Sequence, residues 1–315
     1  MEKISMIEQR SYDLEIHAGP CSINRQNPRE IYQIADIRVK NARGESIRAI
    51  SGTRVVGLKS RTSLSSNPSE MGMDFPILEE QFLLMGETQD HIPPSVEIAS
   101  QIVADTDLVV ASEIMMPDVQ IPHYIGKIPP ERLLLWNPSV DQLGWHIWQT
   151  AKYARNNGWH VGIKNGKSLG TTLVNAQDST SQAITELEKT WVGLASFAQN
   201  LEGRITLIHR GVETPEKELF RSAPVHEVAR RAKRRIPEVR LFFDPSHSCG
   251  PNLRDQIVPI TIEAMRMKDG NNFLYDGILV EAGTSDTDTL QHITLDELRV
   301  LAEELAKFRS LRSPI

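Results

Sequence analysis

The sequence has little cysteine, no excess of positive charge and no long apolar run. Its 315 residues include only two cysteines, Cys21 and Cys249, which cannot build a disulfide framework. A net charge of −6 argues against nucleic acid as a bulk partner. No apolar run approaches the roughly 18 residues of a membrane span, and residues 1–16 lack a signal-peptide core. We therefore expect a cytoplasmic protein that binds neither membrane nor nucleic acid.

What the sequence does contain is a series of eight short apolar runs, nearly all of which end at a residue capable of chemistry. Apolar strands of this length fit a parallel sheet buried on both faces, and the helical segments between most of them indicate βαβ units. Eight such units close into an α/β barrel of the (β/α)8 TIM type. We expect residues 1–315 to form one such domain, with a short N-terminal extension over about residues 1–11. The runs end at Cys21, Lys59, Glu113, Asn137, Lys164, Arg210, His247 and Glu281.

The segments between these runs differ in how clearly they can be interpreted. Apolar residues at three- and four-residue spacing predict helices over 95–104, 140–155, 179–199 and 295–308. Residues 25–53 leave helix and strand open, with a turn predicted near 41–46. Residues 63–76 are rich in Ser, Asn, Pro and Gly, which predicts a long loop after the second strand. Long loops at this end of a barrel usually help to build the binding site.

Three of the strand ends bring together residue types that bind transition metals. Cys21 follows the first strand, Asp244 and His247 follow the seventh, and Glu281 ends the eighth, with acidic residues soon after it. A thiolate, an imidazole and one or two carboxylates suit Mn, Fe, Co or Zn, whereas calcium and magnesium prefer oxygen ligands alone. The alternative is that each residue is a hydrogen-bonded polar group at a strand end. Cys249 is either reactive or a small buried residue.

A second set of strand ends carries positive charge. Several cations at the ends of buried strands need counter-charges or a polyanionic ligand, which points to a phosphorylated or carboxylated substrate. The alternative is local pairing with Glu113 or Asp244. Strand alternation places Lys59 and Arg61 on one face and Arg54 on the other, unless a bulge intervenes. The five cations are Arg54, Lys59, Arg61, Lys164 and Arg210.

Five short motifs occur in the order AGPCS, K-x-RTS, IKNG, HRG and DPSH. In this order and spacing they resemble the 3-deoxy-D-arabino-heptulosonate 7-phosphate (DAHP) synthases, most of all the type I-beta branch, over residues 17–308. The resemblance implies a transferase that carries out a metal-dependent, aldol-type condensation of phosphoenolpyruvate (PEP) with erythrose 4-phosphate. This reaction gives DAHP and phosphate and is the first step of the shikimate pathway to the aromatic amino acids. The family also commonly forms homo-oligomers.

The resemblance assigns roles to individual residues. The metal would be held by Cys21, His247, Glu281 and an aspartate, for which the following helix selects Asp288, with Asp286 as the alternative and His292 as a more remote one. Lys164 is expected to assist proton movement, which places it with Cys21 and His247 among the catalytic residues. Arg61 and Thr62 match the residues that hold the aldose phosphate. The cations that match the PEP-binding set are Arg54, Lys59, Lys164 and Arg210.

The sequence also departs from the family pattern at two places. Ser60 replaces a proline beside Lys59, which removes some rigidity but no charge. At the fourth strand end the family has Gly-Ala-Arg, and here Trp136, Asn137 and Pro138 stand instead. Loss of that arginine could cost a few kcal/mol of phosphate binding unless another group, with Asn137 as the candidate, substitutes for it. Two alternatives therefore stay open: a related PEP-condensing synthase that uses another aldose, as 3-deoxy-octulosonate 8-phosphate and sialic acid synthases do, and a non-catalytic metabolite-binding barrel.

Overall fold

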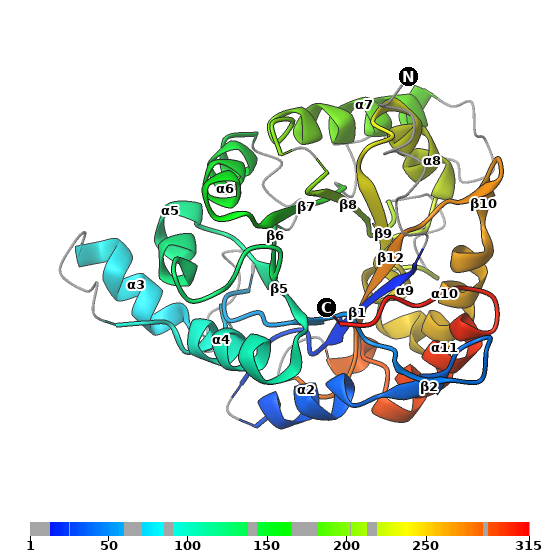
Figure 1. Ribbon diagram of the computed structural model, residues 1–315. Helices are drawn as coiled ribbons and strands as arrows, with labels where there is room; N and C mark the ends of the chain where they lie inside the picture. The colour runs from blue at the N-terminus through cyan, green and yellow to red at the C-terminus, as the bar shows by residue number, and fades with distance from the viewer. Residues whose placement is uncertain are drawn as a thin grey trace, which may run out of the picture.

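Eight parallel strands close into a barrel around the centre of Figure 1, and helices surround it. The computed structural model describes residues 13–24, 26–59, 71–84, 91–137, 144–165, 182–201, 203–212, 219–285 and 289–314, with only the backbone described for residues 81–84, 137, 182, 183 and 289. The barrel closes because β1 pairs with both β4 and β12. This confirms the predicted (β/α)8 fold. The strands are β1 (Glu15–Gly19), β4 (Gly52–Arg54), β5 (Val109–Glu113), β6 (Leu133–Asn137), β7 (His160–Lys164), β8 (Ile205–His209), β9 (Arg240–Phe243) and β12 (Gly277–Glu281).

Helices follow most of these strands, as the alternating pattern predicts. The predicted helices near 95–104 and 295–308 are present as α4 and α11, and those that begin at 140 and 179 are seen from Gly144 and Gln182 onward. The α-helices are α2 (Pro28–Ala35), α3 (Phe75–Leu84), α4 (Pro94–Thr106), α5 (Pro117–Gln120), α6 (Gly144–Asn157), α7 (Gln182–Ser196), α8 (His226–Arg235), α9 (Pro245–Cys249), α10 (Ile257–Arg266) and α11 (Leu295–Ala306). Short 3-10 helices are η2 (Ile121–Tyr124), η3 (Pro251–Gln256) and η4 (Thr289–Gln291).

The segment that the sequence left open contains both a helix and a hairpin. Pro28 begins α2, where its missing N–H costs nothing. The chain then forms a two-stranded antiparallel sheet from β2 (Arg38–Lys40) and β3 (Ser46–Arg48), joined by the predicted turn. A second small sheet pairs β10 (Lys268–Asp269) with β11 (Asn272–Phe273). Neither small sheet belongs to the barrel.

Two apolar layers hold the barrel together. The larger one lies between the sheet and its helices and contains the indole rings of Trp159 and Trp191, whose N–H groups donate to Ile128 O (3.2 Å) and Ile163 O (2.9 Å). The smaller one fills the inside of the barrel, since residues of alternate strands point inward in layers. We call it the interior apolar layer. It consists of Val56, Ala111, Leu134, Trp136, Ile208, Phe242 and Leu279.

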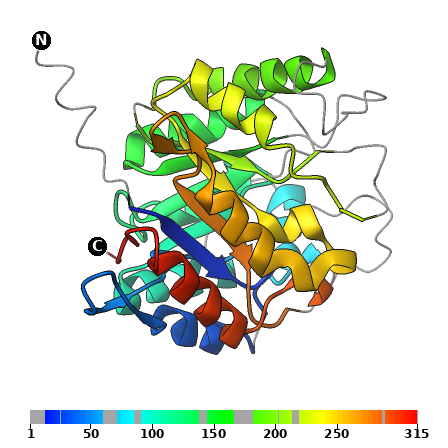
Figure 2. The same ribbon diagram turned by 90° about the vertical axis from the view of Figure 1, so that its right-hand side faces the viewer.

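The interior apolar layer separates two polar ends of the barrel. Figure 2 views the barrel from the side, with β1 running away from the side on which the C-terminus lies. We call the end at which the strands finish the carboxyl mouth, and the end at which they begin the amino mouth. Within the described ranges, no helix is both long enough and apolar enough to cross a membrane.

Candidate functional site at the carboxyl mouth

The order of the strands brings the predicted metal-binding residues to adjacent positions. β12 lies between β1 and β9 in the barrel, and Gly19 pairs with Glu281 in register. Cys21 follows β1 by two residues, and His247 lies in the short helix α9 that follows β9. The side chains of Cys21, His247 and Glu281 are all buried, between 0% and 7% exposed. The carboxyl ends of three neighbouring strands therefore place these residues in one region.

Cys21 is paired with a lysine. The ammonium Nζ of Lys59 lies 2.7 Å from Cys21 Sγ and 3.9 Å from Glu113 Oε2. Burial acts to lower the pKa of Lys59, but the negative charges of the Cys21 thiolate and Glu113 outweigh it and raise the pKa overall. The backbone N–H of Cys21 donates to His292 Nε2 at 2.8 Å. Lys59 is thus a fixed cation that favours the thiolate form of Cys21.

Arg54 connects the first strand end to the last. Its guanidinium is fully buried and donates to Pro20 O (3.2 Å) and to Glu281 Oε1 (3.1 Å), while its Nη1 has no hydrogen-bond partner within the described ranges. The other oxygen of Glu281 accepts from Gln291 Nε2 at 2.7 Å. Burial acts to raise the pKa of Glu281, but His247 and Arg54 lower it overall, so the carboxylate is ionised.

Strand alternation does not separate Arg54 from Lys59 as the sequence pattern suggested. β4 ends at Arg54, and the chain beyond it is no longer a strand. Lys59 can therefore turn toward the same mouth as Arg54. Both side chains are buried there, Arg54 at 0% and Lys59 at 7% exposure.

A third group joins Lys164, Asp244 and His247. Asp244 caps α9, with its Oδ1 accepting the backbone N–H of His247 at 3.0 Å. Lys164 Nζ lies 2.6 Å from Asp244 Oδ2, and His247 Nδ1 lies 3.0 Å from the same oxygen. The N–H groups of the first helical turn have no backbone acceptor, and the Asp244 carboxylate accepts from one of them. This hydrogen bond fixes the position of the carboxylate. Asp244 can then orient both the lysine and the imidazole.

Burial controls the protonation of this group. It lowers the pKa of Lys164 to about 8; Asp244 opposes this lowering, and the neighbouring cations Arg210 and Arg54 add to it. It also lowers the pKa of His247, so the imidazole is neutral at pH 7. Burial alone would raise the pKa of Asp244, but His247 and Lys164 hold it well below its ordinary value. With His247 neutral, the ammonium of Lys164 is the main positive partner of Asp244.

Trp136 forms the floor beneath these charges. Its side chain is 1% exposed and belongs to the interior apolar layer. Lys164 Nζ lies 4.5 Å from the centre of the indole ring, and the Arg54 guanidinium carbon lies 5.4 Å from it. Both distances are within the range of a cation–π interaction. The indole Nε1 is buried without a hydrogen-bond partner within the described ranges. The ring therefore stabilises two cations and leaves one donor for a group that enters the mouth.

Four cations are buried close together at the carboxyl mouth. Arg54, Lys59, Lys164 and Arg210 are each at most 7% exposed, and among the described residues they are accompanied by the carboxylates of Glu113, Asp244 and Glu281 and by the thiolate of Cys21. The backbone N–H of Arg210 donates to Asn165 Oδ1 at 2.8 Å, which fixes the end of β8 beside β7. Buried cations that lie close together repel one another, which is costly. An anionic ligand would reduce this cost.

The predicted metal ligands are only partly arranged for a metal. His247 suits the role, because its Nδ1 faces a carboxylate and this arrangement leaves Nε2 as the basic nitrogen. Cys21 and Glu281 face Lys59, Arg54 and Gln291, however. No three histidine, cysteine, aspartate or glutamate side chains of the described ranges form a group that could hold a metal ion. The metal therefore stays a prediction of the resemblance, and we assign no step to it.

Several predicted site residues lie outside the described residues. They are Arg61, Thr62, Asp286 and Asp288, together with most of the predicted loop 63–76 and with Ser60 and Pro138. Asn137 ends β6 at the carboxyl mouth, and nothing further can be said of its side chain. The metal ligand Asp288 and the aldose-phosphate residues therefore stay predictions.

The structure adds residues that the sequence interpretation did not place in the site. Asp244 was identified at the seventh strand end and as an ion-pair partner, but its role as the cap of α9 was not predicted, although an aspartate three residues before His247 is a recognisable helix cap. Gln291, which donates to Glu281, was not predicted. His292 was the remote alternative for the metal ligand, and in the structure its Nε2 accepts the backbone N–H of Cys21 across the barrel mouth. Only the fold shows that contact. Trp136 gave a clearer signal, since a large aromatic residue at a barrel strand end must occupy the mouth or its floor.

The sequence matches no protein-family model, and no curated protein matches it.

Proposed function

We propose that the protein is a PEP-condensing synthase of the DAHP synthase type. The observation that carries the proposal is the gathering of four buried cations, Arg54, Lys59, Lys164 and Arg210, at the carboxyl mouth of a (β/α)8 barrel. Active sites of such barrels lie at this end. PEP carries a carboxylate and a phosphate, and buried ammonium and guanidinium groups bind both strongly. The five motifs of the resemblance support the same reaction.

In the proposed reaction, C3 of PEP attacks the aldehyde carbon of the acceptor and forms the new carbon–carbon bond. The aldehyde oxygen takes up a proton and becomes a hydroxyl. A water adds at C2 of the former PEP and gives up its protons as the C2 keto group forms. The C2–O bond to the phosphate breaks, and phosphate leaves with the bridging oxygen and the electrons of that bond. Lys59, Lys164, Arg54 and Arg210 would stabilise the carboxylate and phosphate charge throughout.

Lys164 is our candidate for the proton donor. Its pKa of about 8 lies near neutral pH, where a group can both hold and release a proton. Asp244, 2.6 Å away, would keep the ammonium group oriented. Lys164 is thus a cation for the substrate and a source of the proton for the aldehyde oxygen.

The resemblance further implies a divalent metal held by Cys21, His247, Glu281 and Asp288. Such a metal would supply polarisation of the aldehyde or orientation of a water. The requirement stays a prediction, because the described side chains face other partners.

The identity of the acceptor aldose is the open part of the proposal. Trp136, Asn137 and Pro138 stand where the family has Gly-Ala-Arg, so the phosphate of PEP would be held differently. A related synthase that uses a different aldose is therefore the second candidate. The structure places the indole of Trp136 directly against two of the cations, which distinguishes this floor from one built by glycine.

The test is to incubate the purified protein, with each of Mn, Fe, Co and Zn in turn, with PEP and a panel of aldoses. The panel contains erythrose 4-phosphate, arabinose 5-phosphate, ribose 5-phosphate and free N-acetylmannosamine. PEP loss and phosphate release are measured together, because condensation requires equal amounts of both. Turnover with erythrose 4-phosphate supports the proposal. Turnover only with a pentose or hexose derivative supports the second candidate, and no turnover with any pair contradicts both.

A further inference from the structure

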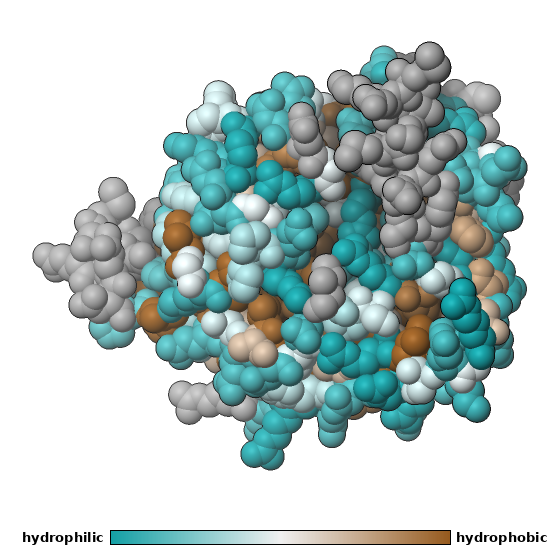
Figure 3. Space-filling model, in the orientation of Figure 1, coloured by the Kyte–Doolittle hydropathy of each residue, from teal (hydrophilic) through white to brown (hydrophobic). Residues whose placement is uncertain are grey.

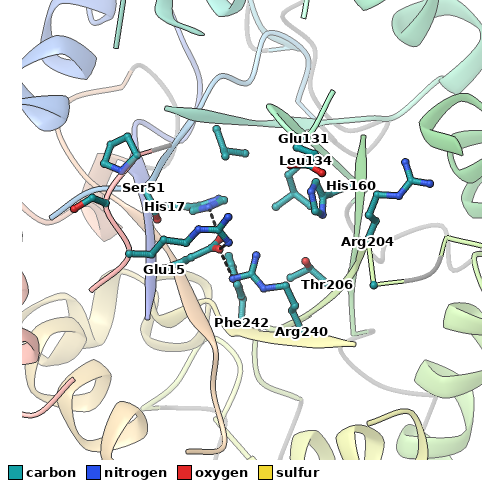
Figure 4. Close-up of a pocket in the computed structure, with 15 residues that line it drawn as sticks. Glu15, His17, Ser51, Glu131, Leu134, His160, Arg204, Thr206, Arg240 and Phe242 are labelled. Carbon is teal, nitrogen blue, oxygen red and sulfur yellow. Dashed lines mark hydrogen bonds and ion pairs between the residues drawn. The ribbon is translucent and has the colours of Figure 1, made fainter. Parts of the chain in front are cut away.

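A second polar cavity lies at the opposite end of the barrel from the candidate active site. It has a volume of about 260 Å³ and is lined by residues at the beginnings of the strands, including Glu15, His17, His160 and Arg240. Residues of the C-terminal segment, among them Arg312, complete its wall. Figure 4 shows these side chains converging from different strands around one space, and Figure 3 shows the surface of this end hollowed near its centre. The volume is just below the roughly 300–1,000 Å³ of pockets that bind drug-sized ligands.

The interior apolar layer separates this cavity from the carboxyl mouth. Leu134 and Phe242 line the cavity and belong to that layer, while Trp136, two residues beyond Leu134 on β6, contacts the cations of the other mouth. The edge of the His17 ring also packs on Phe242, with ring centres 5.1 Å apart and planes at 88°. The cavity is therefore a site of its own and not the lower part of the candidate active site.

Arginines dominate the charge of the cavity. Arg240 lies 2.5 Å from Glu15 Oε1, and Arg312 pairs with the same oxygen. A single carboxylate cannot use all five N–H donors of each of two guanidinium groups. Their side chains are 22% and 39% exposed, so the remaining donors can reach a ligand. Arg204 also lines the cavity and makes one long hydrogen bond, of 3.4 Å, to Ala154 O.

His160 is held neutral at the centre of this positive region. Burial, together with the charges of Arg240, Arg204 and Arg312, lowers its pKa to about 4, and Glu15 opposes this lowering. The three arginines therefore act on one position. A bound anion would offset their charge there, and His160 provides a local reporter of that event.

His17 provides a hydrogen-bonding position that the described residues do not satisfy. Its ring is 2% exposed, and its Nε2 lies 3.2 Å from Glu15 Oε2. Since a carboxylate only accepts, Nε2 carries the proton in this pair, and in the neutral form of the ring Nδ1 is an acceptor. That Nδ1 atom is buried and has no partner within the described ranges. Buried polar atoms are normally paired, so a donor from a ligand would be favoured there.

We propose that the amino mouth is a binding site for a small anion that also carries a hydroxyl group. Arg204, Arg240 and Arg312 would bind its carboxylate or phosphate oxygens, and His17 Nδ1 would accept its hydroxyl. Hydroxy acids and phosphorylated polyols have this combination. A ligand here acts apart from the substrate, on the other side of the interior apolar layer, so the site suits an effector.

The test is an NMR titration of the histidine imidazole groups at constant ionic strength, with (S)-malate, succinate and inorganic phosphate as probes and chloride as the reference. The His160 resonance is assigned by its loss in His160→Gln. We expect malate to raise the pKa of His160 saturably and to bind about 3–10-fold more tightly than succinate, which lacks the hydroxyl. Phosphate should compete with malate for the same site.

Variants show whether the effect belongs to this cavity. Arg240→Gln and Arg204→Gln should each weaken malate binding at least about tenfold, since each removes a charged donor. Arg204→Gln is informative even if Arg240→Gln does not fold, because the hydrogen bond that the described residues offer the Arg204 guanidinium, to Ala154 O, is long. Arg299→Gln, on the exposed side of α11, is the matched control and should bind as the wild type does.

Lys164→Met removes a cation of the other mouth and should leave the His160 response unchanged. The proposal is overturned if His160 shows no saturable response, if Arg204→Gln binds malate as tightly as the wild type, or if the response is lost in Lys164→Met. Equal affinity for malate and succinate would overturn the role of His17.

Discussion

The two mouths of the barrel are built from similar residues but differ in how far their charges are removed from water. At the carboxyl mouth, Arg54, Lys164 and Glu281 are at most 1% exposed. At the amino mouth, the side chains of Arg240 and Arg312 keep 22% and 39% of their exposure. Charges interact much more strongly where water is excluded. This difference agrees with the proposals of chemistry at the carboxyl mouth and of reversible binding at the amino mouth.

The largest effect should come from Cys21→Ala, which changes the carboxyl mouth where its thiolate meets Lys59. We expect loss of both bound divalent metal and PEP-dependent activity, because the thiolate is the one sulfur donor of the predicted metal set. Metal content is measured by elemental analysis after dialysis, and activity by phosphate release. Cys249→Ala is the control, since burial raises the pKa of that thiol to about 12 and makes it a poor ligand. Activity that survives Cys21→Ala would show that the metal assignment is wrong.

The second effect concerns the layer that keeps the two mouths apart. Trp136→Ala should lower the free energy of unfolding by about 3–5 kcal/mol, because a fully buried ring is lost and leaves a cavity. Trp145→Ala, at a position 71% exposed, is the control and should change stability by no more than about 0.5 kcal/mol. Denaturant unfolding measures both. Equal stability of the two variants would mean that Trp136 does not fill the barrel interior.

The third effect is on pH dependence at the carboxyl mouth. Lys164 must be protonated to bind an anion, and its pKa is about 8, so kcat/KM for PEP should fall tenfold per pH unit above pH 8. In Lys164→Arg the guanidinium keeps its charge, and this decline should move up by more than one pH unit. An unchanged profile in the variant would assign the decline to another group.

The smallest effect is on stability at the amino mouth. The pKa of His160 falls from 6.5 when unfolded to about 4 when folded, so between pH 6.5 and 4 the unfolded chain binds more protons. Stability from this group is therefore full above pH 6.5 and is lost as the pH falls toward 4. His160→Gln should reduce the loss between pH 7 and 5 by about 1–2 kcal/mol. Thermal unfolding at both pH values measures it, and parallel pH profiles for variant and wild type would contradict it.

The barrel and the residues at its strand ends could be predicted from the sequence because each apolar run is local and each ends at a polar residue. The contacts of those residues could not. Cys21 meets Lys59 because β4 stops at Arg54, and no periodicity marks that early end. Glu281 meets Arg54 and Gln291 only once the barrel closes. The amino mouth was not predicted. His17, His160 and Arg240 lie inside or at the start of strands, whereas the sequence interpretation used the residues at which the apolar runs end.

The most direct test of the account is the affinity for PEP, measured by isothermal titration calorimetry at pH 7 in the wild type, Lys164→Met and Lys152→Met. Lys164 is buried at the carboxyl mouth, whereas Lys152 lies on the outside of the barrel in α6. Removal of one buried charged contact should weaken PEP binding at least about 30-fold in Lys164→Met, corresponding to about 2 kcal/mol. Lys152→Met should bind PEP as the wild type does. Equal affinity in all three proteins would contradict the central claim that PEP binds among the buried cations of the carboxyl mouth.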